Sequence, residues 1–398
     1  MNRGWARGSQ HVTVIGCDGR PPGPDATNAL AEARTVIGAP RHLSAVPIPE
    51  TAERIELRHL DEALDTVSQH PGPTAVLASG DPGFFGIVRA LRARGIAPTV
   101  IPAVSSVALA FARIGLDWDD AVVLSAHGRE PAQALAAALA HPKAAILTAP
   151  GTAAGLARDL HAAGKRVYAV ELLGTPEEKV GVLSAETGLA DPNVLISLDK
   201  QAEGQPRWLA GHPGAPDGWA LPEDAFEHRD SMITKPEVRA LVLARLGPAP
   251  GRTIWDVGAG SGSVAVECAR FGAWVIAIES DPAQCAKIRR NAERHHVRLR
   301  VHHGRAPEAL IGLPPADAVF TGGGDHTVLA AAIRLASPRT VVVTLAAVQR
   351  VGETATLLAG QGYRADGVQL QASRLKPLPG GNHRLAAQNS VFVLWGQR

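Results

Sequence analysis

The chain has 398 residues, and 45% of them are hydrophobic, which is ordinary for a folded protein. Its 40 basic and 38 acidic residues leave a formal charge of +2, which argues against nucleic-acid binding because that function needs a basic stripe. No apolar run is long enough to span a membrane, and the length predicts two or three domains.

Short β-branched runs alternate with Ala- and Leu-rich stretches along the first half of the chain. The alternation starts with strands at residues 12–15, 35–37, 74–78 and 98–101 and helices at 25–33 and 87–94. It restarts after Asp117, with strands at 121–124, 144–147, 166–170 and 194–197. This pattern predicts an α/β fold with largely parallel sheets in two subdomains.

The composition changes between Asp199 and Gly218, where Gln, Gly, Pro and Trp occur without periodicity, as in a linker. A second α/β series then follows, with strands predicted at residues 253–257, 274–279, 299–302, 316–321, 340–345 and 392–395. We therefore expect one domain at residues 1–205 and a Rossmann-like domain at residues 212–398.

The three cysteines, Cys17, Cys268 and Cys285, form no C-x-x-C pair. A small, odd number argues against a disulfide framework and predicts reduced thiols in a cytoplasmic protein. The apolar run at residues 12–15 is too short for a secretory signal.

A glycine-rich turn follows the first strand of the second series. The segment from Asp256 to Gly262 reads Asp-Val-Gly-Ala-Gly-Ser-Gly and leads into a helix predicted over residues 264–270. Its glycines allow a tight turn and the close approach of a ligand. Ser263 stands where a dinucleotide fingerprint has its third glycine, and the spacing favours S-adenosylmethionine (SAM) over a pyrophosphate cofactor.

The next strands of this half supply further candidate residues. Glu279 ends the second strand, where an acidic side chain accepts the ribose hydroxyls of a cofactor. The turn at 303–307 is expected beside the adenine, and the Gly322–Gly324 loop is expected to line the substrate pocket. The alternative for this loop is a plain flexible connection.

Four histidines, His295, His296, His302 and His303, lie close together in the sequence. Their spacing does not place three on one helix or strand face, and no cysteine accompanies them. We interpret them as surface or packing histidines and predict no metal site.

Three polar segments follow strands of the first half, at residues 77–86, 102–106 and 125–129. Together they predict a cleft. His127 is a candidate acid or base and Arg129 a candidate carboxylate ligand. The alternative is that both face solvent or only support other residues. No motif specifies a nucleophile–base pair, so the catalytic residues stay unassigned.

These motifs together resemble the fused, decarboxylating precorrin methyltransferases of cobalamin biosynthesis. The first half is similar to the tetrapyrrole methylase family through Val12–Gly16, Arg41–Leu43, Ser79–Pro82, Ser105–Ser106 and Ser125–Arg129. The second half is similar to the decarboxylating subunit through Thr234–Arg239, Asp256–Gly262, Ala306–Glu308 and Gly322–Gly324. One loop, Gly16–Gly23, is longer and less regular than the G-x-G-P-G loop usual in the methylase family.

The resemblance implies a tetrapyrrole-methylase fold of two α/β subdomains, followed by a class I methyltransferase fold. It implies SAM-dependent methylation of a precorrin-6 intermediate at carbons 5 and 15, with decarboxylation of a ring acetate, to give precorrin-8. The implied partner is this small tetrapyrrole, and we expect the chain to form a homo-oligomer.

The resemblance also implies the residues that hold SAM. In the first half they are Ser79, Gly80, Asp81, Ser105 and Ser106. In the second half they are Thr234, Gly258, Ala259, Gly260, Ser261, Gly262, Glu279 and Ala306.

Two other functions compete with this hypothesis. A SAM-dependent RNA methyltransferase predicts a basic surface and stacking aromatic residues, and neither is evident in this sequence. A SAM-sensing regulatory protein predicts SAM binding without turnover of any tetrapyrrole.

Overall fold

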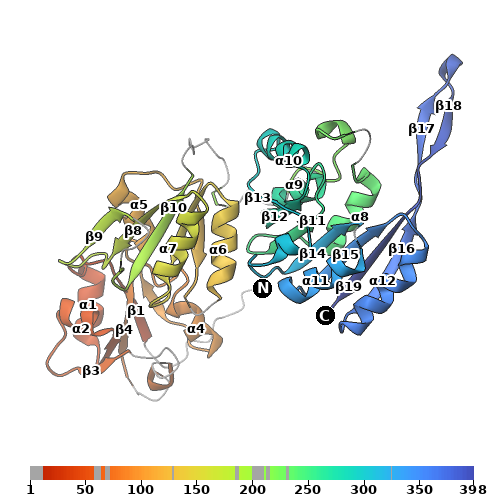
Figure 1. Cartoon of the computed structure of the whole chain (residues 1–398). Coiled ribbons are helices and arrows are strands. Elements are labelled where there is room, and N and C mark those ends of the chain that lie inside the picture. The colour runs from red at the N-terminus through yellow and green to blue at the C-terminus, as the bar shows by residue number, and fades with distance from the viewer. Residues whose placement is uncertain are drawn as a thin grey trace. The chain divides into compact units, whose positions relative to one another are not determined.

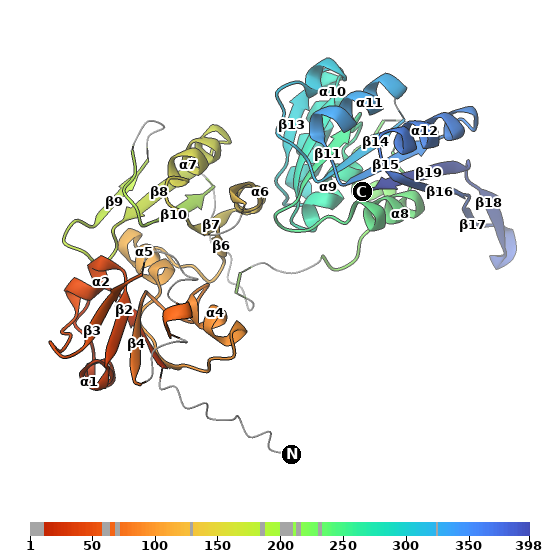
Figure 2. The ribbon, with the colours of Figure 1, turned by 90° about the horizontal axis from the view of Figure 1, so that it is seen from below.

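Two units share the chain in the computed structural model (Figures 1 and 2): residues 1–129 with 143–208, and residues 130–142 with 209–398. The structure describes residues 12–57, 64–67, 72–127, 130–183, 188–199, 210–211, 216–229, 233–323 and 325–398. Arg129, Gly324 and most of the predicted linker lie outside these ranges. The predicted domain limits at 205 and 212 also fall there and stay predictions.

The first sheet is wholly parallel, in the order β3-β2-β4-β1-β5. Its strands are β1 (Val12–Cys17), β2 (Thr35–Gly38), β3 (Glu53–Glu56), β4 (Thr74–Ser79) and β5 (Thr99–Ile101). Apolar strand residues pack on one face against α1 (Pro24–Glu32) and α2 (Pro40–Ala45), and on the other against α4 (Ile87–Ala93). Burial on both faces explains why β1, β2 and β4 read as apolar runs, whereas the edge strand β3 is largely exposed and charged.

The second sheet has the order β6-β7-β10-β8-β9. Its strands are β6 (Val122–Ser125), β7 (Lys143–Leu147), β8 (Arg166–Glu171), β9 (Lys179–Val182) and β10 (Asn193–Leu198), with the helices α5 (Ser106–Ile114), α6 (Pro131–Ala140) and α7 (Ala153–Ala162) in this part of the chain. Only β6 and β7 are parallel, so the expectation of a largely parallel sheet was wrong here. The buried strand β10 lies between β7 and β8 and runs antiparallel to both. The expectation failed because an apolar pattern shows that a strand is buried but not in which direction it runs.

The third sheet has seven strands in the order β13-β12-β11-β14-β15-β19-β16. They are β11 (Thr253–Val257), β12 (Trp274–Glu279), β13 (Arg300–His303), β14 (Ala318–Gly322), β15 (Thr340–Leu345), β16 (Arg364–Leu370) and β19 (Val391–Gln397). The first five strands of this order are parallel, whereas β19 runs antiparallel to both of its neighbours. The predicted α/β class is confirmed.

Side chains alternate between the two faces of this third sheet. Ile254 packs toward α8 (Pro236–Leu246), α9 (Ser263–Arg270) and α10 (Pro282–Arg294). The next residue, Trp255, packs toward α11 (His326–Ala336), and the strands beyond it pack toward α12 (Gln349–Gly360). Helices therefore cover both faces of the sheet and leave its edge of strand ends for function.

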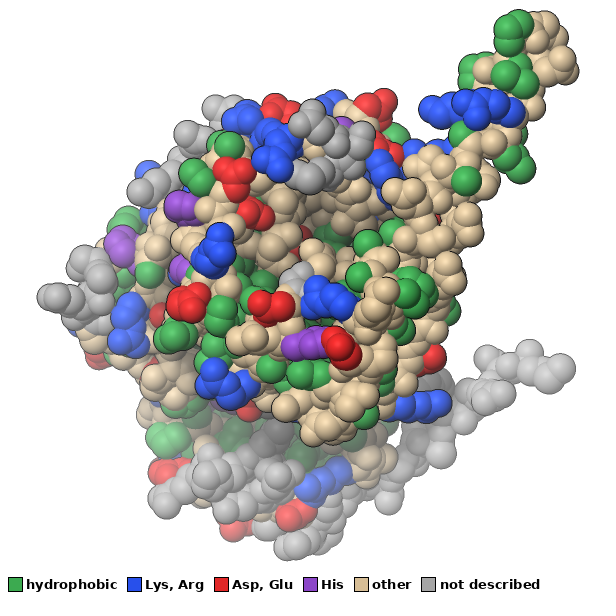
Figure 3. Space-filling model, turned by 45° about the vertical axis from the view of Figure 1, so that its right-hand side comes forward, with side chains coloured by type: hydrophobic (Ala, Val, Ile, Leu, Met, Phe, Trp, Pro, Cys, Tyr) green, Lys and Arg blue, Asp and Glu red, His purple; other side chains and the backbone are tan. Residues whose placement is uncertain are grey.

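A two-stranded hairpin, β17 (Ser373–Pro377) with β18 (His383–Ala387), extends from this sheet (Figures 1 and 2). Apolar side chains lie on its surface (Figure 3), where Leu375 is 68% and its cross-strand partner Leu385 is 67% exposed. At the base of the hairpin, Arg374 donates to Glu237 and Glu223 over 2.7–2.9 Å.

Three short 3₁₀ turns complete the described structure: η1 (Glu223–Ala225), η2 (Glu308–Leu310) and η3 (Pro379–Gly381). Among the described residues, no helix combines the length and apolar character needed to cross a membrane.

Candidate functional site

The glycine-rich turn joins β11 to α9, as the sequence predicts. Gly258, Gly260 and Gly262 have positive φ angles of 73°, 55° and 76°, which residues with a side chain rarely adopt. A Cβ at Gly258 or Gly260 would meet no atom within 4 Å, whereas one at Gly262 would lie 2.9 Å from Ile288 of α10. The first two glycines therefore face open space, and the third allows α9 and α10 to pack closely.

Glu279, at the end of β12, holds this turn in place. Its Oε2 accepts a hydrogen bond from the Gly260 N–H at 2.8 Å, and its Oε1 accepts from the backbones of Ser280 and Asp281 at 2.7 and 2.9 Å. The backbone oxygen of Glu279 accepts from the Gly304 N–H at 2.9 Å. One residue thus connects three strand ends, and its predicted contact with ribose hydroxyls stays a prediction.

A cavity of about 310 Å³ opens beside this turn. Its lining includes Gly258, Ser280, Gly304, Ala306, Thr321 and Gly322. Two of the sequence-predicted residues, Gly258 and Ala306, therefore face one cavity, and Gly322 of the predicted substrate loop joins them.

The donor set at this cavity fits SAM. Thr321, which lines the cavity, has a buried Oγ1 without a hydrogen-bond partner in the described part of the chain. The open space at Gly258 and Gly260 leaves backbone groups accessible to a ligand. A compact cofactor with polar groups would give the Thr321 hydroxyl a partner.

Asp256 is 1% exposed, and its Oδ2 accepts a hydrogen bond from the Ala265 N–H at 2.9 Å. Burial, with a smaller contribution from the charge of Glu279, raises the pKa of this carboxyl to about 7 against the lowering effect of the Ala265 hydrogen bond. The residue before the glycine turn therefore titrates near neutral pH.

A buried residue that the sequence did not reveal supports the turn and its neighbours. Asn291 of α10 is fully buried and donates to the backbone oxygens of Ser261 and Glu227 at 2.9 and 3.0 Å. Its Oδ1 accepts from the Glu227 N–H at 2.7 Å. It thus ties the glycine turn to the segment before α8. An asparagine at a core-facing helix position was the available signal, because buried amides need partners.

Thr234 is held by a buried ion pair. Arg239 and Glu267, both without solvent exposure, lie 2.6 Å apart, and Arg239 Nη1 donates to the Thr234 backbone oxygen at 2.7 Å. Glu267 also accepts from the backbone N–H groups of Ala220 and Leu221. The network fixes the chain at Thr234, whose predicted contact with SAM stays untested.

In the first domain, three strand ends meet. A Cβ on Gly16 would lie 2.5 Å from the Gly80 backbone oxygen and 2.6 Å from the Ala103 N, so only glycine fits there. A Cβ on Gly80 would lie 2.9 Å from the Ser106 N. The predicted pairs Ser79–Asp81 and Ser105–Ser106 are therefore brought together at one edge of the sheet.

Two of these side chains have local partners. Asp81 Oδ1 accepts from the Gly83 N–H at 2.8 Å, and Ser105 Oγ caps α5 by accepting from the Ala108 N–H at 3.2 Å. The structure therefore gives each a turn-stabilising role, and their contact with SAM stays a prediction.

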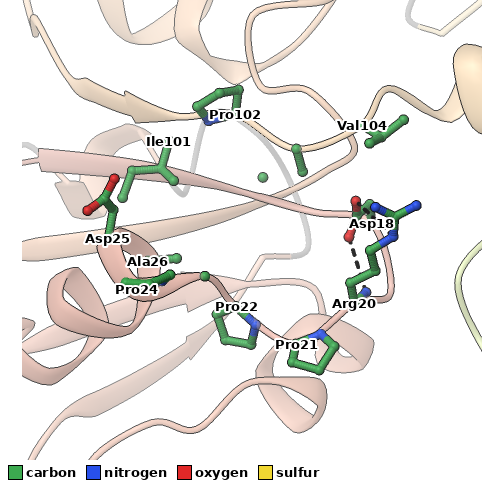
Figure 4. Close-up of a pocket in the computed structure, with 13 residues that line it drawn as sticks. Asp18, Arg20, Pro21, Pro22, Pro24, Asp25, Ala26, Ile101, Pro102 and Val104 are labelled. Carbon is green, nitrogen blue, oxygen red and sulfur yellow. Dashed lines mark hydrogen bonds and ion pairs between the residues drawn. The ribbon is translucent and has the colours of Figure 1, made fainter.

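The irregular loop after β1 lines a separate cavity of about 470 Å³ (Figure 4). Asp18, Arg20 and the prolines of the loop lie along it, with Ile101 and Val104 from the β5 exit. The Arg20 N–H donates to Asp18 Oδ1 at 3.1 Å, which stabilises the turn. The longer loop therefore forms one wall of a cavity at the strand ends.

The remaining candidates are the predicted acid or base His127, the predicted carboxylate ligand Arg129 and the four histidines near residue 300. His127 is exposed, and Arg129 lies outside the described residues. His295 contacts the Ala225 backbone oxygen at 2.8 Å and stacks near Phe226, as expected of a packing histidine. His303 lies 3.1 Å from the Ser280 backbone oxygen.

Comparisons with known proteins bear on both halves. Residues 24–187 match the family described as tetrapyrrole (corrin/porphyrin) methylases, and residues 224–396 match the precorrin methyltransferase domain. A precorrin-6Y C(5,15)-methyltransferase (decarboxylating) from Sinorhizobium sp is 39% identical over 342 residues, which cover 79% of each chain. The chain belongs to this family of decarboxylating precorrin methyltransferases.

Two further members of the group are similar to parts of the chain. A cobalt-precorrin-6B C(15)-methyltransferase (decarboxylating) from Salmonella typhimurium is 38% identical over 176 residues, 42% of this chain and 89% of its own. The solved C-terminal domain of a Rhodobacter capsulatus precorrin-6Y C5,15-methyltransferase is 34% identical and covers 45% of this chain and 97% of its own, with a TM-score of 0.39. The predicted cofactor is confirmed, since methyltransferases of this family use SAM.

We predict that Gly260→Val abolishes SAM binding in the C-terminal domain of this family member. A branched side chain would fill the open space beside the turn and strain its positive φ. Calorimetric titration of the full chain with SAM measures the effect. Gly312→Val is the matched control, because Gly312 also has a positive φ and open surroundings but lies outside the glycine turn. Undiminished binding by Gly260→Val would show that the turn does not meet the cofactor.

We also predict a pH-dependent stability from Asp256. Between about pH 4 and pH 7 the folded state keeps a proton that the unfolded state has released, so the free energy of unfolding falls as pH rises through this window. Asp256→Asn carries no titrating proton there. The difference in unfolding free energy, variant minus parent, should therefore increase with pH. Urea denaturation on both sides of the window measures it, and a constant difference would contradict the raised pKa.

Proposed function

We propose that the chain is a SAM-dependent enzyme that methylates a precorrin-6 intermediate at carbons 5 and 15 and decarboxylates a ring acetate, giving precorrin-8 in cobalamin biosynthesis. The observation that carries this proposal is the similarity to one named enzyme across 79% of both chains, through both domains. The cavity beside Gly258 and Ala306 supports it, because its buried, unpartnered Thr321 hydroxyl offers a hydrogen bond to a polar ligand such as SAM.

We further propose that the two reactions divide between the domains. The similarity to a decarboxylating C(15)-methyltransferase that spans only 42% of this chain supports one domain carrying both carbon-15 methylation and decarboxylation. The precorrin methyltransferase domain at residues 224–396 is the candidate for that pair of reactions. Methylation at carbon 5 then falls to the N-terminal domain.

In the C-terminal domain, Gly258–Gly262, Glu279, Ala306 and Thr234 are the residues that would hold SAM. SAM supplies, when bound, a methyl group activated by its sulfonium. The protein contributes orientation and exclusion of water: Glu279 and Asn291 hold the glycine turn rigid, and Gly322 borders the cavity. The conjugated macrocycle itself takes up the electron pair released by decarboxylation, so no side chain is assigned as an electron sink.

The division of reactions is tested with Glu279→Ala. This variant removes the predicted hydrogen bond from Glu279 to the ribose of SAM. Loss of such a charge-assisted hydrogen bond costs on the order of 1.5–3 kcal/mol, so at limiting SAM the C-terminal reactions should slow roughly ten- to a hundredfold. Incubation with reduced precorrin-6 and SAM, followed by mass spectrometry, should reveal pigment that lacks one methyl or keeps its acetate carboxyl.

The control variant is Glu293→Ala, which removes an exposed carboxylate from α10 and should form product at the parent rate. Glu279→Gln, which retains one acceptor oxygen for the Gly260 N–H, separates a binding defect from a collapsed turn. Full conversion by Glu279→Ala at the parent rate would refute the assignment of the two reactions to domains.

We propose a cytoplasmic homo-oligomer. The three free cysteines, which form no disulfide, support a reducing compartment. The hairpin supports self-association, because Leu375, Leu378 and Leu385 expose apolar surface on a projecting arm that a second copy of the chain would cover.

We predict that the double variant Leu375→Ser with Leu385→Ser lowers the molar mass measured by light scattering toward that of the single chain. Its SAM binding should persist, because neither side chain lines the cavity. Ile311→Ser, at an equally exposed position outside the hairpin, is the control. A parent chain that is already monomeric would rule out this oligomer.

A further inference from the structure

Arg41, at the start of α2, has no role in the proposed function but contacts Ser79, one of the predicted cofactor residues, in a small polar cluster. Its Nη2 donates to Ser79 Oγ at 2.7 Å, and its Nε donates to His42 Nε2 at 3.2 Å. Arg41 and Ser79 are exposed, whereas His42 is 9% exposed. Two fixed neighbours therefore orient a guanidinium that a ligand can reach.

His42 serves this cluster as a neutral acceptor. Because the Arg41 Nε–H donates to Nε2, that nitrogen carries no proton. Burial and, to a lesser degree, the charge of Arg41 lower the pKa of His42 to about 4. The ring is thus neutral at physiological pH, and Ser79 Oγ lies 3.3 Å from the same nitrogen. His42 positions Arg41 and adds no charge.

The charge of Arg41 has no counterion among the described residues. Other constrained cations of the chain do have one: Lys143 lies 2.6 Å from Asp120, Arg239 lies 2.6 Å from Glu267, and Arg374 contacts two glutamates. Burial lowers the pKa of Arg41, with only the nearby Cys17 opposing this shift.

Cys17 does not neutralise that charge. Burial and Asp18 raise the pKa of its thiol to about 11, so it stays uncharged. Arg41 therefore carries a partly desolvated positive charge with its Nη1 unused by any protein acceptor in the described residues.

The cluster lies where the strand ends converge. Ser79 is the last residue of β4, Cys17 is the last of β1, and Gly80 approaches Ser106 so closely that a Cβ would lie 2.9 Å from its backbone N. In a parallel sheet, this edge is where ligands bind. The unpaired guanidinium thus faces the edge that holds the predicted N-terminal cofactor residues.

We propose that Arg41 binds a carboxylate of a ligand in the N-terminal domain and that Ser79 and His42 position it. The inference rests on the proposed function, in which this domain is a methylase. A guanidinium fork matches a carboxylate, and both ligands carry one: SAM in its amino-acid part, the tetrapyrrole in its acetate side chains.

The test uses the full chain and the variant Arg41→Gln, with Arg92→Gln of α4 as an exposed arginine control. Calorimetry with S-adenosylhomocysteine and with 5′-methylthioadenosine, which lacks the amino-acid carboxylate, measures the cofactor arm. Steady-state turnover of reduced precorrin-6 measures the tetrapyrrole arm.

If the carboxylate belongs to SAM, Arg41→Gln should weaken S-adenosylhomocysteine binding at one site roughly ten- to a hundredfold and leave methylthioadenosine binding unchanged. If it belongs to the tetrapyrrole, cofactor binding should stay unchanged and the KM for the pigment should rise by a similar factor. In whichever arm responds, His42→Leu should raise the dissociation constant or the KM by a smaller factor and should leave kcat unchanged. This result distinguishes positioning from a general loss of structure.

Arg41→Lys keeps the positive charge but lacks the two-pronged guanidinium. Its binding constant or KM should lie between those of the parent and Arg41→Gln, which a misfolded variant would not show. Turnover by the parent chain tests the proposed function, and the comparison of variants tests Arg41. Parent and Arg41→Gln with equal binding and KM in both arms would overturn the inference even where the parent enzyme turns over normally.

Discussion

Glu279 provides the contacts on which the C-terminal site depends. Its carboxylate binds the Gly260 N–H, and its backbone oxygen binds the Gly304 N–H, so the ends of β11, β12 and β13 are joined through one residue. Without these bonds, the turns after the three strands would lie next to one another with no fixed spacing. The buried carboxylate and the glycine conformations are therefore mutually dependent.

The first domain achieves the same convergence by a different physical means. There the ends of β1, β4 and β5 meet through backbone contact that leaves no room for a Cβ on Gly16. Close packing fixes the N-terminal strand ends, whereas charge-assisted hydrogen bonds fix the C-terminal ones. Both domains thus have an edge at which three strand ends converge, supported by steric contact in one and by a carboxylate in the other.

Buried polar groups away from the cavities extend this support. Asn291 connects the glycine turn to the segment before α8, and the Arg239–Glu267 pair secures Thr234 on the same segment. An ion pair without solvent exposure contributes little net stability, but removing one partner leaves an uncompensated charge. In this protein the ion pair fixes the path of the backbone at Thr234, just before α8 of the C-terminal domain.

The strand and helix pattern of both halves was readable from the sequence because apolar runs and glycine turns report local burial and backbone freedom. The strands at 253–257, 274–279 and 340–345 have the limits that the sequence predicts. The hairpin at 373–387 was not predicted. Its leucines are exposed on a projecting arm, so its sequence has neither the apolar pattern of a core strand nor the composition of a loop. The direction of β10 was also hidden, because a fully buried strand has the same composition in either direction.

The sequence by itself determined the class of fold and the family, and it predicted the segments that line each candidate site, because these follow from residue types at short spacing. Only the tertiary structure decided which side chains have partners. It placed the Glu279 carboxylate against the Gly260 N–H and Arg41 against Ser79. Within the described residues it left Asp256 Oδ1 and Thr321 Oγ1 without hydrogen-bond partners and Arg41 without a counterion. These contacts join residues 19 to 38 positions apart, and hydrogen bonding and desolvation over such separations depend on how the strands assemble into a sheet.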